Sequence, residues 1–128
     1  MTRVRLAVLY FLLVFAAGFV FGTARELVAV PLLGRDAAGL AEVPFMLVAI
    51  FAGAWLTMRR PGAPSTRAGA LALGALSLAL VLLAELALSP VVRGGVAAWF
   101  ASFTPTTLAS AILLWIAHAA APAVVVRA

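Results

Sequence analysis

The sequence contains no cysteine, no lysine and no asparagine, and its 128 residues include a single histidine, His118. Without cysteine the chain can form no disulfide, no iron–sulfur cluster, no thiolate metal site and no cysteine nucleophile. A single histidine also excludes a His-pair metal site or a bis-histidine haem within one chain. We therefore expect neither a metal nor a cofactor.

Charged residues are scarce as well: they make up 10% of the chain, whereas hydrophobic residues make up 66%. Soluble domains carry about 25% charged residues, and a soluble chain this apolar would be unable to cover its own surface. The mean hydropathy of +1.22 agrees with this imbalance. The composition predicts one all-α domain over residues 1–128, an integral membrane four-helix bundle with short interfacial segments, surrounded by membrane lipids.

The formal net charge of +5 does not indicate a nucleic-acid partner. All nine basic residues are arginines that occur singly or in pairs between apolar runs. They form no continuous basic face that a phosphate backbone would follow. Arginines that flank apolar helices instead hold loops in the cytoplasm, so we exclude nucleic acid as a partner.

Apolar runs predict four membrane spans, at about residues 6–24, 43–58, 68–88 and 105–121. A spanning helix needs about 20 predominantly apolar residues. The first run is longer than the apolar part of a signal peptide, so we interpret it as a retained helix. The third span contains one charge and is expected to stop at Ser89–Pro90.

Two further segments, at about residues 27–42 and 95–103, are too short or too interrupted to span. We expect the first along the membrane surface or folded partly back into the bundle, and the second as a short interfacial or re-entrant helix. The second span should begin close to Pro44, because proline suits the first turn of a helix, or alternatively earlier, near Ala38. Thr104–Pro105 marks the start of the fourth span, with threonine as the N-cap. The aromatic ring of Tyr10 is expected at the membrane interface.

The distribution of arginine predicts the orientation. Six arginines fall on the side of the two termini: Arg3, Arg5, Arg59, Arg60, Arg67 and Arg127. Three fall on the other side: Arg25, Arg35 and Arg93. The positive-inside rule then places both termini in the cytoplasm.

A small group of charged residues forms the candidate polar cluster. Glu85 lies inside the third span, where a carboxylate is a functional hypothesis by default and a structural ion pair is the alternative. Arg25, at the end of the first span, is its natural partner. Glu26 and Glu42 compete for Arg25, and Arg93 competes for Glu85. The sequence leaves the pairing open.

His118 is the weak candidate for a ligand-binding residue. It lies in the half of the fourth span that is far from Glu85. A lone histidine in a span can bind a haem or chlorophyll axially, but it more often forms a hydrogen bond across a helix interface. No Ser–His–Asp set, phosphate loop or paired acidic metal motif accompanies it, so we expect no catalytic residues.

Small residues at four-residue spacing are candidates for helix packing. Gly18 and Gly22 form a GxxxG in the first span, Gly53 lies in the second and Gly74 in the third. Such residues let helix backbones approach closely in lipid. The packing partner is either another helix of the same chain or a separate subunit.

The first half of the chain also carries a recognisable series of residues. They are Gly22-Thr-Ala-Arg25-Glu-Leu, Pro31, Gly34, Glu42-Val-Pro44-Phe-Met-Leu, Trp55 and Arg59-Arg60. Over about residues 6–60 the sequence resembles a family of uncharacterised small four-helix bacterial membrane proteins. The resemblance implies a bacterial inner (plasma) membrane location and, because we know of no activity for the family, no mechanism.

Three functional hypotheses follow. The leading one is a non-enzymatic subunit or helix-packing module that associates with itself as a homo-oligomer or with a larger membrane complex. The alternative is a small oligomeric transporter or channel that uses Glu85 and Arg25. The third, an enzyme acting on lipid or quinone, would require a pocket that joins Arg25, Glu42 and Glu85.

Overall fold

The computed structural model describes residues 2–92 and 94–126, and every regular element in this part of the chain is helical. The elements are α1 Thr2–Ala24, the π-helical turn η1 Arg25–Ala29, α2 Val30–Leu33, α3 Arg35–Met58, α4 Arg67–Val92, α5 Val96–Ala101 and α6 Pro105–Val125. Four of the helices are long and apolar enough to cross a membrane. The all-helical class and the four long apolar helices are therefore as predicted.

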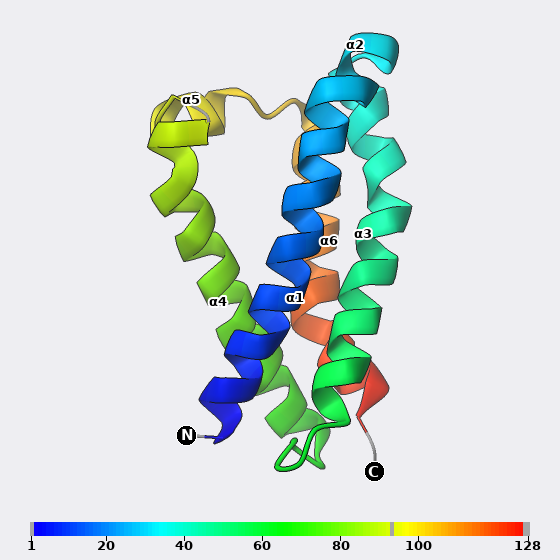
Figure 1. The fold of residues 1–128 in the computed structure, drawn as a ribbon, viewed down its shortest axis with the longest axis vertical. Coiled ribbons are helices and arrows are strands. Elements are labelled where there is room, and N and C mark those ends of the chain that lie inside the picture. The colour runs from blue at the N-terminus through cyan, green and yellow to red at the C-terminus, as the bar shows by residue number, and fades with distance from the viewer. Residues whose placement is uncertain (1, 93, 127–128) are drawn as a thin grey trace.

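The long helices are arranged so that α1 and α6 each contact both α3 and α4. They alternate in direction, which brings the beginning of α1 and the end of α6 to the same end of the molecule (Figure 1). At this end α4 crosses close to α1, but toward its C-terminal end α4 diverges from the other three helices (Figure 1). The two ends of the molecule therefore differ in how closely the helices meet.

The segment 27–42 is helical on both sides of Gly34 and continues the neighbouring long helices. The first helix continues through the π-helical turn and α2, and then stops at Gly34, where φ is +84°. The next helix, α3, begins at Arg35, eight residues before the apolar run at Val43. The difference arises because charged side chains end an apolar run without ending a helix, whereas a residue with positive φ interrupts the helix itself.

The third span also extends further than expected, since α4 continues past Ser89–Pro90 to Val92. Pro90 has no N–H to donate to the carbonyl of Leu86. The Ser89 hydroxyl donates to that carbonyl instead, at 2.8 Å. A local side-chain hydrogen bond thus replaces the missing backbone one, and the helix gains one more turn.

The short helix α5 lies within the segment 95–103 and connects the end of α4 to the start of α6 (Figure 1). α6 begins at Pro105, where the Thr104–Pro105 pair places a helix start. The Thr104 side chain accepts a hydrogen bond from the backbone N–H of Thr107 at 3.1 Å. It also donates to Asp36 at 2.6 Å, which ties the start of α6 to the start of α3.

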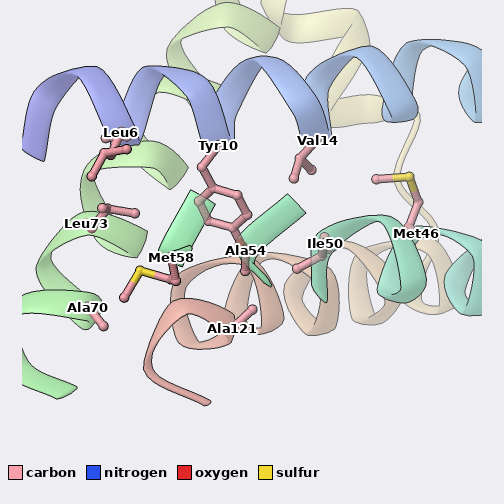
Figure 2. Packing of buried hydrophobic residues seen from close by; sticks show 11 residues of the cluster. Leu6, Tyr10, Val14, Met46, Ile50, Ala54, Met58, Ala70, Leu73 and Ala121 are labelled. Carbon is pink, nitrogen blue, oxygen red and sulfur yellow. The ribbon is translucent and has the colours of Figure 1, made fainter. Parts of the chain in front are cut away.

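The buried apolar cluster lies mainly in the half of the molecule where α4 is close to α1. Its members are Leu6, Ala7, Tyr10, Val14, Met46, Ile50, Ala54, Met58, Ala70, Leu73 and Ala121. Figure 2 shows the Tyr10 ring projecting from α1 toward α3 and α6. Tyr10 is fully buried between the helices. Its hydroxyl donates to a backbone carbonyl of α6, a contact that its position in the sequence alone did not reveal.

Candidate functional site

A cleft between α4 and the other long helices is the candidate site, and its floor is built around a proline. Pro122 has no N–H, so it leaves the carbonyl of His118, four residues earlier, without its helical partner. The Tyr10 hydroxyl crosses from α1 and donates to this carbonyl at 2.6 Å. The rings of Tyr10 and His118 stack with centroids 4.3 Å apart. Pro122 in α6 thus frees the His118 carbonyl to accept the hydrogen bond from Tyr10 of α1.

The same histidine joins α6 to α4. A hydrogen bond of 2.9 Å connects His118 Nε2 with the Ser77 hydroxyl, and both residues are buried. This is a bond across a helix interface, the more common role of a lone histidine in a span. Sequence reasoning missed Ser77, because a serine in an apolar helix gives no sign of its partner. Pro122 four residues after His118 was the available signal for the Tyr10 contact.

Two of the candidate packing glycines lie where helices of this chain meet. A Cβ at Gly74 would clash with the backbone of Ala119, whose carbonyl carbon would lie 2.9 Å away. The backbones of α4 and α6 therefore touch at this point. A Cβ at Gly53 would lie 3.3 Å from Cγ2 of Val14, which places Gly53 at the contact between α3 and α1.

Beyond this floor the diverging α4 leaves a cleft of about 850 Å³. The other two candidate glycines, Gly18 and Gly22, line it. A Cβ at Gly18 would meet only the end of the Met46 side chain, at 3.6 Å, and one at Gly22 only the guanidinium of Arg25, at 3.8 Å. The GxxxG of α1 therefore faces open space and side-chain tips rather than another helix backbone.

The walls of the cleft are mainly apolar. They include, from the four long helices, α5 and the residues just after α5, Val14, Phe15, Phe19, Met46, Ile50, Leu78, Val81, Leu88, Trp99, Phe103, Leu114 and Trp115. His118 lies at the deep end, and Thr107 and Ser110 add hydroxyl groups on the α6 side. The cleft thus runs from the middle of the molecule toward the end that carries the acidic residues, opposite the end with the five exposed arginines.

A chain of ion pairs forms the rim. Arg25 donates from Nη1 to Glu42, whose side chain is only 11% exposed, and its Nη2 lies 3.4 Å from Glu26. Glu26 also accepts from Arg35 at 3.1 Å. The network therefore links the π-helical turn to the start of α3. Of the acids that the sequence left as possible partners of Arg25, Glu42 and Glu26 both pair with it.

Glu85 lines the α4 side of the same cleft, opposite this network. The cleft consequently includes Arg25, Glu42 and Glu85 together, which is the arrangement that the hypothesis of an enzyme acting on lipid or quinone required. Arg93, the remaining member of the predicted cluster, lies outside the described residues. Chemically, the site offers charged and hydroxyl groups at one end and an apolar interior at the other.

Comparison with known proteins adds no relative: no family model, no curated protein and no solved structure matches this chain.

Proposed function

We propose that this chain is a non-enzymatic, multi-pass protein of a bacterial inner membrane that holds one amphiphilic molecule in the cleft between α4 and the other long helices. Membrane embedding is supported by the outward side chains. Phe19, Val48 and Ile116, on three different helices, are 63%, 71% and 62% exposed, whereas Ser77 and His118 are buried. Apolar groups outside and polar groups inside suit a lipid environment.

The orientation with both termini in the cytoplasm is supported by the charge at the two ends. The end where α1 begins and α3 ends carries five exposed arginines, Arg3, Arg5, Arg59, Arg60 and Arg67. The acidic side chains Glu26, Asp36, Glu42 and Glu85 all lie toward the other end. An excess of arginine marks the cytoplasmic side of a membrane protein.

The single observation that carries the proposed function is the polarity gradient of the cleft. Its volume of about 850 Å³ lies within the range of about 300–1,000 Å³ that is usual for small-molecule pockets. An apolar wall ending at the rim of Arg25, Glu42 and Glu85 matches a molecule with an apolar body and a polar group at one end. Such a molecule would reach the site from the surrounding membrane.

The glycines of α1 favour an occupied cleft over a tightly closed one. Gly18 and Gly22 remove side chains from the wall at the place where α4 is already far from α1. In lipid, helices associate through close packing, and an unfilled space loses those dispersion contacts. We therefore assign the space left by both glycines to the apolar body of the bound molecule.

Native mass spectrometry of the protein purified in a mild detergent tests this proposal. The wild-type chain should retain an adduct of a single amphiphile that survives removal of the detergent. Gly18→Leu places a side chain into the cleft and should reduce the retained adduct by about tenfold, since it removes contact area and adds a clash. Ala16→Leu is the matched control, because Ala16 is exposed on the outer side of the same helix and lies outside the cleft.

An equal loss in both variants, or no adduct in the wild-type chain, would contradict the proposal. The same spectra report the mass of the whole assembly. If the cleft is instead filled by another protein subunit, the wild-type chain will appear as a defined oligomer or complex, and Gly18→Leu will release the bare chain.

Transport is the second candidate function, because ionisable residues and the cleft occur together. The cleft leads from the rim of Arg25 and Glu85 down to His118, where the contacts of Tyr10 and Ser77 close it. A carrier would expose such a half-open path to one side of the membrane. Solute flux into liposomes that is lost in both Arg25→Gln and Glu85→Gln would favour transport, and flux that survives both substitutions would exclude it.

A further inference from the structure

A second, separate groove lies at the arginine-rich end of the molecule. It has a volume of about 470 Å³ and is lined by Thr2, Arg5, Leu6, Leu9, Arg60 and Pro61. Arg5 and Arg60 are both exposed and come from different elements, the first turns of α1 and the loop after α3. Two arginines and two leucines therefore line the same groove.

The loop that carries Arg60 is fixed closely against α1. The N–H of Arg60 donates to Thr57 at 3.1 Å, and its carbonyl accepts from Ala63 at 3.2 Å. Gly62 has a φ of +83°, and a Cβ there would lie 2.5 Å from Cγ2 of Thr2. Only glycine allows this turn to close on the first turn of α1 without displacement. The backbone of the loop therefore holds Arg60 on the same groove as Arg5.

The other arginines at this end have different surroundings. The guanidinium of Arg59 stacks on Trp55, 4.6 Å from the ring centroid. Arg3 lies near Gly69, at the start of α4. Arg67 is the first residue of α4 and does not line the groove. The groove consequently distinguishes Arg5 and Arg60 from three neighbours that carry the same charge.

We propose that this groove binds the phosphate group of an anionic phospholipid, with Arg5 and Arg60 on the phosphate and Leu9 against the beginning of an acyl chain. Guanidinium groups bind phosphate oxygens bidentately. The groove lies at Leu6, where the apolar run of α1 begins, which is the depth of a lipid headgroup. Every acidic side chain in the sequence lies toward the opposite end, so the local charge favours an anion.

Lipid titration followed by native mass spectrometry of the full chain provides the test. Dioleoyl phosphatidylglycerol should bind with a higher affinity than dioleoyl phosphatidylcholine, and inorganic phosphate should not displace it. Arg5→Gln and Arg60→Gln should each weaken phosphatidylglycerol binding by about tenfold, because each removes one charge-assisted pair. Arg67→Gln removes the same charge at the same end and should change the affinity less than about twofold, the generic surface effect alone.

A second variant separates geometry from charge. Gly62→Ala keeps every charge but pushes the loop away from Thr2, so it should also weaken phosphatidylglycerol binding, without altering the circular dichroism spectrum. An equal loss in Arg67→Gln and Arg5→Gln would show diffuse attraction and overturn the proposal. Equal affinity for the two lipids, or displacement by inorganic phosphate, would overturn it as well.

Discussion

The two halves of this molecule use the same kinds of residue for different purposes. In the half around Gly74, glycine brings α4 against the backbone of α6, and Tyr10, Ser77 and His118 connect three helices. In the other half, the glycines of α1 face a cleft of about 850 Å³. We refer to these as the closed half and the open half.

The comparison shows that small residues bring helix backbones close together only where a second helix packs against them. Gly18 and Gly22 form the only GxxxG considered in the sequence, yet a Cβ at either position would make ordinary contacts. Gly74, followed by no second glycine at that spacing, is the glycine where an added Cβ would clash most severely, against the backbone of Ala119. In the closed half, the helices are joined by hydrogen bonds between Tyr10, Ser77 and His118, by backbone contact at Gly74 and by the buried apolar cluster.

The largest effect is expected from substitutions at the glycines of the two halves. Gly74→Ala should lower the free energy of unfolding by about 3 kcal/mol, because the new methyl group would overlap the Ala119 backbone and separate α4 from α6. Gly18→Ala should have little effect or stabilise slightly, since its methyl group meets only a flexible side-chain end. Unfolding in mixed micelles, followed by circular dichroism, measures both. Similar losses in the two variants would remove the distinction between the halves.

A smaller effect is expected from the bond between α1 and α6 in the closed half. Tyr10→Phe should lower the free energy of unfolding by about 1 kcal/mol, because it leaves the buried carbonyl of His118 without a donor. In a Pro122→Ala background the loss should be smaller, since the alanine N–H can bond to that carbonyl within the helix. A double-mutant cycle measures this coupling. Additive effects would show that the proline does not create the acceptor.

The smallest effect separates an interhelical hydroxyl from an intrahelical one. Ser77→Ala removes the bond to His118 and should lower the free energy of unfolding by about 0.6 kcal/mol. Ser110 lines the open half, and its hydroxyl donates to the Thr106 carbonyl of the same helix at 3.0 Å. Ser110→Ala should therefore leave the stability unchanged within error. A larger loss at Ser110 than at Ser77 would place the more important polar contact in the open half.

The number and position of the long helices could be predicted because apolar length is a local property of the sequence. The start of α6 was predictable for the same reason, since Thr104 and Pro105 act on their own turn. Boundaries based on charge were less accurate: α3 begins at Arg35, because Gly34 rather than the charged residues interrupts the helix. The positive φ of Gly34, which the positions of the charged residues do not indicate, decided where α3 begins.

Ion pairs join three members of the predicted charged cluster, Arg25, Glu26 and Glu42, but the sequence analysis predicted neither the pairing nor the contribution of Arg35. Arg25, Glu26 and Glu42 lie close to one another in sequence or across one tight connection, so their meeting follows from chain connectivity. Glu85 reaches the same cleft from α4, and its distance from Arg25 depends on how far α4 diverges. The angle between helices is a property of packing over their whole length, and no single residue specifies it.

By itself, the sequence determined an all-helical chain with four long apolar helices and an excess of arginine at one end. Each of these features depends on residues that are close together in the sequence. Only the tertiary structure decided that Tyr10 and Ser77 meet at His118, that Gly74 rather than Gly18 lies at a backbone crossing, and that a cleft opens beside Arg25. These features depend on the relative rotation and tilt of helices that are distant in sequence, and close packing fixes both only when all of the helices are present.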